Sequence, residues 1–80
     1  MIATKSLVRG AKVFATMDIV GFWTATIPEG THGTVVRVGD GSIDVLWQMR
    51  GGCREKGGAW DPELQWTFEA TVSSEAIGIV

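Results

Sequence analysis

Apolar and polar residues alternate with a period of two along much of this 80-residue chain, and that period restricts it to a fold built from β-strands. The alternation is clearest over 42–50 and 64–70. The apolar faces of these two stretches are Ile43, Val45, Trp47 and Met49 in the first, and Leu64, Trp66, Phe68 and Ala70 in the second. Shorter stretches at 11–16, 34–38 and 77–80 are also rich in apolar or β-branched residues. The pattern therefore predicts five strands, each with a face toward a shared core.

Glycine and proline separate these strands. The segment 39–41, Gly-Asp-Gly, predicts a tight hairpin between 34–38 and 42–50. Pro-Glu-Gly at 28–30 predicts a turn at the end of a long first loop, and the glycine pairs that bracket 51–58 predict an exposed loop. Asp61-Pro62 is expected to turn the chain into the fourth strand, and 73–76 to form one 3₁₀ turn capped by a serine hydroxyl.

Eighty residues provide one domain, which we place at 1–80 with 1–8 as a loose N-terminal arm. Short strands in so small a chain close into a barrel more readily than they form a two-layer sandwich, because closure removes exposed edges. Cys53 is the single cysteine, so no intramolecular disulfide forms, and this fits a reducing cytoplasm. No apolar run approaches the roughly 20 residues that span a membrane.

Several segments together resemble a known family. They are Val13-x-Ala15, the stretch 27–36 that reads I-P-E-G-T-x-G-T-V-V, Val45-Leu46-Trp47, and Glu75-Ala76-Ile77. This pattern, over roughly 9–80, resembles bacterial SH3-like barrels. The resemblance implies an all-β, SH3-like five-stranded barrel with a short 3₁₀ turn before the last strand.

Proteins with this form differ widely in function. They include accessory proteins of phage, plasmids and integron gene cassettes, the nitrile hydratase β-subunit barrel, and RNA-binding or methyl-reading KOW- and Tudor-like modules. The tetrameric trimethoprim-resistant dihydrofolate reductase also has this fold, but its active-site Val-Gln-Ile-Tyr stretch has no counterpart in a chain without tyrosine. Because one fold carries all these functions, the resemblance selects none of them.

The four tryptophans form two pairs. Trp47 and Trp66 occupy the apolar faces of predicted strands, which indicates core packing. Trp23 and Trp60 belong to no alternating pattern. In SH3-like barrels the first loop and the loop between strands three and four often lie together and form the ligand groove. There these indoles would stack on a proline, a base or a methylated cation; the alternatives are that they cap the barrel ends or pack in a homodimer.

The candidate ligand-binding residues are therefore the loop aromatics and the acids beside them, which favour a cationic or basic-peptide ligand: Phe22, Trp23, Trp60, Asp61 and Glu63. A second set, Arg50, Arg54 and Lys56, could contact an anion or, joined by Arg9 and Lys12, a nucleic acid. The formal net charge of −2 does not favour that use.

No residue set indicates catalysis, a cofactor or a metal. The glycines around 51–58 lack the Lys-Ser/Thr of a phosphate-binding loop, and Cys53 and His32 are not placed by the sequence as a catalytic pair. We therefore expect a cytoplasmic, non-enzymatic module that binds a protein or peptide, with self-association left open and no membrane partner. The alternatives are a nucleic-acid-binding barrel and an oligomeric enzyme with its site at a subunit interface.

Overall fold

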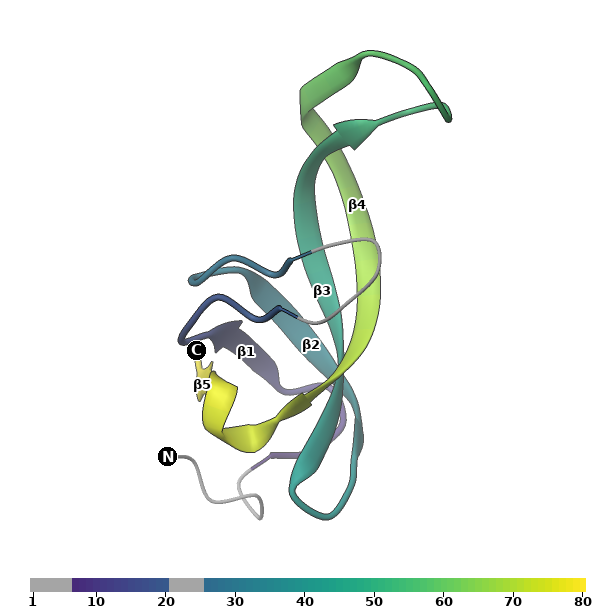
Figure 1. The fold of residues 1–80 in the computed structure, drawn as a ribbon. Helices are drawn as coiled ribbons and strands as arrows, with labels where there is room; N and C mark the ends of the chain where they lie inside the picture. Colours follow the sequence, from purple (N-terminus) through teal and green to yellow (C-terminus); the bar gives the residue numbers. More distant parts are fainter. Residues whose placement is uncertain (1–6, 21–25) are drawn as a thin grey trace.

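In the part of the chain that the structure describes, five antiparallel strands form one sheet, and a 3₁₀ turn precedes the last strand (Figure 1). These features come from a computed structural model that describes residues 7–20 and 26–80. The strands are β1 (Lys12–Ala15), β2 (His32–Val38), β3 (Ser42–Cys53), β4 (Trp60–Ser73) and β5 (Ile77–Ile79), and the 3₁₀ turn is Ser74–Ala76. Their order across the sheet is β4-β3-β2-β1-β5. The all-β prediction and the place of the 3₁₀ turn are confirmed.

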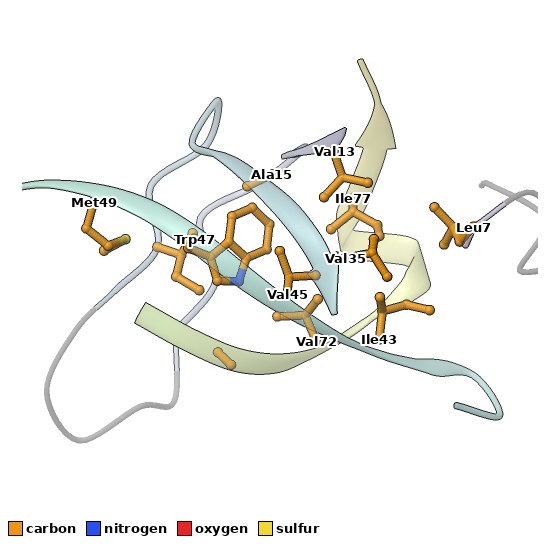
Figure 2. Packing of buried hydrophobic residues seen from close by; sticks show 12 residues of the cluster. Leu7, Val13, Ala15, Val35, Ile43, Val45, Trp47, Met49, Val72 and Ile77 are labelled. Carbon is orange, nitrogen blue, oxygen red and sulfur yellow. The ribbon is translucent and has the colours of Figure 1, made fainter. Parts of the chain in front are cut away.

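The core lies on one face of this curved sheet, and β3 contributes most to it (Figure 2). Its residues Ile43, Val45, Trp47 and Met49 are all buried, as the alternation predicts. Val13, Ala15, Val35, Val72 and Ile77 bring the other four strands onto the same core. The period-two pattern identifies this face because a strand with one wet side must place its apolar residues on the other.

Strand β2 departs from a simple alternation. The sequence places Thr34, Val36 and Val38 on one face, but a bulge between Val35 and Arg37 shifts the register. After the bulge Val38 pairs with the buried Ile43, so Val38 leaves the face that Thr34 occupies. An inserted residue reverses the side to which later side chains point.

Gly33 makes room for the largest core residue. It pairs with Trp47 across β2 and β3, and a Cβ on Gly33 would lie 2.5 Å from Val45 Cγ1 and 3.0 Å from Trp47 Cε3. The Trp47 indole is fully buried, and its N–H has no hydrogen-bond partner among the described residues. The second glycine of the G-T-x-G motif is therefore required by packing rather than by a turn.

Strands β3 and β4 extend beyond the rest of the sheet as a two-stranded ribbon, which gives the molecule its 42 Å long axis (Figure 1). The expected loop over 51–58 and the expected turn at Asp61-Pro62 are corrected here. Gly51 to Cys53 belong to β3, Asp61 and Pro62 belong to β4, and the connection is only 54–59. Pairing continues from Gly52 with Asp61 to Cys53 with Trp60.

A register shift lets the ribbon contain proline. Pro62, Glu63 and Leu64 oppose the single residue Gly51, so Pro62 lies in a bulge, where its missing N–H does not interrupt the ladder. The Asp61 carboxylate accepts a hydrogen bond of 2.9 Å from the Glu63 backbone N–H and so stabilises the bulge.

The C-terminal segment and the first described residue return to the sheet. The Ser73 hydroxyl accepts a hydrogen bond of 3.2 Å from the Glu75 N–H, which confirms the predicted cap. Of the expected arm 1–8, Leu7 is buried in the core and Val8 is exposed, while 1–6 lie outside the described residues. Within the described part of the chain, no helix has the length and apolar character needed to cross a membrane.

Candidate ligand groove

A groove of about 890 Å³ lies between the β3–β4 ribbon and the segment 26–31 that leads into β2. The ribbon contributes Trp60, Leu64, Trp66 and Met49 to its wall. The opposite wall contains Thr26, Pro28 and Thr31. This volume falls within the range of known ligand sites, and the lining has their usual mixture of apolar surface and a few polar groups.

The floor of the groove is the Gly51-Gly52 backbone, on which two indoles pack. Gly51 has a φ of +88°, and a Cβ there would lie 2.8 Å from Trp60 Cζ2. The Trp66 indole N–H donates a hydrogen bond of 2.9 Å to the Gly51 carbonyl. A Cβ on Gly52 would lie 3.4 Å from Leu64 and 3.5 Å from Trp66. Two adjacent residues without side chains therefore let both indoles lie close to the strand.

The two indoles differ in exposure. Trp60 is 68% exposed although it contacts Gly51. Trp66 is half-buried, packs against the core cluster and lies 6.2 Å from Phe68 between ring centroids. Trp66 thus has the predicted packing role, and it also lines the groove, which the sequence reading missed. The one indication in the sequence was Gly51-Gly52. This pair points to a site for the indoles only when it is known that the glycines lie next to the two tryptophans.

The predicted acidic residues have other roles. Asp61 lies on the side of the ribbon next to the 54–59 connection. There its carboxylate accepts a hydrogen bond of 3.2 Å from Arg54 Nε and lies 3.1 Å from Arg54 Nη2. Glu63 forms an ion pair of 4.0 Å with Arg50. Neither carboxylate belongs to the lining of the groove, to which Arg50 and Arg54 are the charged contributors among the described residues. Phe22 and Trp23, the other predicted ligand contacts, lie outside the described residues.

The predicted basic residues are dispersed. Arg50 and Arg54 line the groove, but Lys56 lies in the exposed connection 54–59 and is not part of the lining. Arg9 and Lys12 are also absent from the lining; Lys12 lies on β1, where its Nζ donates a hydrogen bond of 2.9 Å to the Thr34 hydroxyl. The five cations therefore do not line one groove.

Cys53 and His32 lie on different strands. Cys53 is exposed at the end of β3 and pairs with Trp60, whereas His32 begins β2 and pairs with Phe14, with ring centroids 6.5 Å apart. Across residues 7–20 and 26–80, no three His, Cys, Asp or Glu side chains form a group that could hold a metal ion.

One carboxyl outside the groove has a clearly displaced pKa. The Thr71 hydroxyl donates to the Asp44 carboxylate, and Arg37 Nε donates to it at 2.8 Å. These hydrogen bonds, the one from Thr71 first, lower the pKa of Asp44 below its ordinary value of 3.8, and the charge of Arg37 adds to the effect. The interaction joins β2, β3 and β4 and therefore stabilises the sheet beside the turn between β2 and β3.

Comparison with known proteins gives no relative for this chain: no family model, no curated protein and no solved structure matches it. The class is therefore defined by the fold and the groove alone. It is a small antiparallel β-protein with an aromatic groove on a projecting ribbon.

Proposed function

We propose that this chain is a small SH3-like binding module, without catalysis of its own, that holds an extended protein segment in the groove. The observation that carries the proposal is Trp60, which lies 68% exposed on Gly51 beside Trp66. Because most of this indole is still exposed to water, its burial by a partner would release most of the hydrophobic free energy that the side chain can contribute. Tryptophan is also enriched among the residues that dominate binding energy at protein interfaces.

The construction of the groove supports an extended ligand. Its walls come from the ribbon and from the segment 26–31, and the sheet holds one wall in place through the pairing of β3 and β4. The groove is half open rather than enclosed, which suits a chain that passes through more than a small molecule that must be surrounded. In the SH3-like barrels that the sequence resembles, the first loop and the loop between strands three and four often form the ligand groove, which supports a site near Trp60. The resemblance also suggests a cytoplasmic accessory protein of a phage or mobile element.

The two alternatives are less well supported. A nucleic-acid interface would need cations gathered on one surface, and only Arg50 and Arg54 of the predicted five line the groove. An enzyme with a site between subunits would need several copies around one centre. Its test is the mass in solution by light scattering, where a monomer would count against it.

The proposal can be tested with short random peptides displayed on phage and selected on the immobilised full chain. Affinities of the selected peptides are then measured by fluorescence anisotropy with the wild type, with Trp60→Ala, and with Val80→Ala, which removes an equally exposed apolar side chain outside the groove. We expect Trp60→Ala to weaken binding at least about thirtyfold, the effect of a loss of about 2 kcal/mol at an interface centre.

Val80→Ala should bind as the wild type does. Because Trp60 has only about a third of its surface covered, its removal should reduce the free energy of unfolding by only about 1 kcal/mol. A urea titration of each variant checks that the chain is still folded. Selection of no peptides, or of peptides that Trp60→Ala binds equally well, would overturn the proposal.

A further inference from the structure

The last part of β3 has one side that no described strand covers. β2 pairs with β3 only as far as Gly33 with Trp47, whereas β3 continues to Cys53 (Figure 1). Over this last part β4 lies on one side, and the other side receives no backbone hydrogen bond from residues 7–20 and 26–80. A strand directs the N–H and C=O groups of alternate residues to each of its sides. The end of β3 therefore presents unpaired main-chain donors and acceptors beyond the place where β2 stops.

The chain before β2 turns away from β3 and leaves a space beside this open side. It stays with β1 instead: the Ala15 N–H donates a hydrogen bond of 2.9 Å to the Thr31 carbonyl, and the Gly30 N–H donates one of 2.8 Å to the Ala15 carbonyl. The groove lies between this segment and β3, and its lining includes every residue from 49 to 54. Because consecutive strand residues point to opposite faces, a lining without a gap indicates that the groove runs along the side of the strand.

Two glycines keep the main chain of this part of β3 accessible. Gly51 and Gly52 have no side chains to cover the strand, and glycine inside a strand often marks a place where another backbone approaches closely. The Gly51 carbonyl already accepts the Trp66 indole N–H, so the open groups belong to its neighbours in 49–53. Trp60 and Trp66 supply apolar surface to the same groove.

The outer side of β4 is less suited to receive another strand. β4 is the last strand of the sheet, so its outer side is also unpaired by any described strand. There Pro62 lies in a bulge, between the charged residues Asp61 and Glu63. Proline, bulges and charged side chains are the features that keep sheet edges from pairing with another chain. The stretch 49–53 of β3 contains no proline and two glycines, so the groove side is the one that admits a strand.

We infer that the bound segment is an additional β-strand, which pairs its main chain with the open side of β3 over 49–53 and packs an apolar side chain on Trp60 and Trp66. This inference rests on the proposed function and specifies its ligand: a segment that adopts a strand, in contrast to a proline-rich segment that binds through its side chains alone. Main-chain hydrogen bonds give such a strand its affinity, and the pocket for an alternate side chain gives it specificity.

The inference is tested with one peptide selected on the immobilised full chain, in which each backbone N–H in turn is replaced by N-methyl. This change removes one main-chain donor and leaves the side chains as they are. We expect N-methylation at alternate positions of the paired stretch to weaken binding about tenfold or more, because a carbonyl of β3 also loses its partner. The positions between them are the matched controls. Their N–H groups point away from β3, so their N-methyl forms should bind as the parent peptide does.

Amide hydrogen exchange of the wild-type chain, measured by nuclear magnetic resonance with and without the parent peptide, locates the new pairing. The N–H groups of 49–53 that exchange quickly in the free chain should exchange about tenfold or more slowly at saturation with the peptide. The N–H groups of 61–66 on the outer side of β4 should exchange as they do in the free chain.

The inference alone fails if binding requires Trp60 but tolerates N-methylation at every position, as a proline-rich ligand would. It also fails alone if the new protection appears over 61–66 instead of 49–53. The inference and the proposed function both fail if no peptide is selected, or if Trp60→Ala binds the selected peptides as tightly as the wild type does.

Discussion

Replacement of Gly51 by alanine tests the geometry of the groove floor. Gly51 has a φ of +88°, a conformation that costs an L-residue about 1–2 kcal/mol. The new Cβ would also lie 2.8 Å from Trp60 Cζ2. Since the Trp60 side chain is largely exposed, we expect the indole to move off the floor rather than the sheet to open. The free energy of unfolding should therefore decrease by about 1–2 kcal/mol, and the thermal midpoint by roughly 5–15 °C.

Gly41→Ala is the matched control. Gly41 has a φ of +79° in the turn between β2 and β3, and a Cβ there would have no atom within 4 Å. Both variants should lose similar stability in urea titrations followed by circular dichroism, because both place alanine in the left-handed region. Only Gly51→Ala should also weaken the binding of a selected peptide, since only that change displaces Trp60. The reasoning is refuted if Gly51→Ala matches the wild type in both stability and binding while Gly41→Ala is destabilised.

Three further changes test the core and the ion pair beside the turn between β2 and β3. Trp47→Ala empties a fully buried site and should cost about 3–5 kcal/mol, seen as an unfolded or nearly unfolded chain by circular dichroism. Gly33→Ala should cost about 1–3 kcal/mol in a urea titration, because its Cβ would overlap Val45; an unchanged midpoint would contradict this close packing. Asp44 has a lowered pKa when folded, so its contribution to stability is present above pH 3.8 and is lost as the pH falls through the folded pKa. Urea midpoints of the wild type should decrease more steeply over that acidic range than those of Asp44→Asn, and parallel curves would disprove the linkage.

Local pattern predicts the part of the fold in which each strand has one buried face. The alternation over 42–50 identifies the core residues of β3, and Gly-Asp-Gly at 39–41 identifies its hairpin to β2. The ribbon was not predicted, because Gly51-Gly52 and Asp61-Pro62 each have the local character of a turn. In the structure they face each other across a bulge, and the carboxylate of Asp61 holds that bulge through the Glu63 N–H. Whether these segments form turns or strands is decided by their pairing with each other, which the local sequence does not show.

The candidate site was predicted only in part, again because local sequence does not show which distant residues lie together. Trp60 was identified because it interrupts the alternation, and the structure places it in the groove. Trp66 follows the alternation, so the sequence assigns it to the core and does not show that it also lines the groove. Adjacency in sequence to Trp60 does not reveal that Asp61 pairs with Arg54 or that Asp61 is absent from the groove lining.

The most direct test of the groove as the binding surface is a nuclear magnetic resonance titration of the wild-type chain with a selected peptide. Backbone amide and indole N–H signals report each residue separately. The account predicts that the shifted signals map to Met49–Arg54, Trp60–Trp66 and the segment 26–31, and include the indole N–H groups of Trp60 and Trp66. Shifts that map instead to β1 and β5, with the signals of both indoles unchanged, would contradict it.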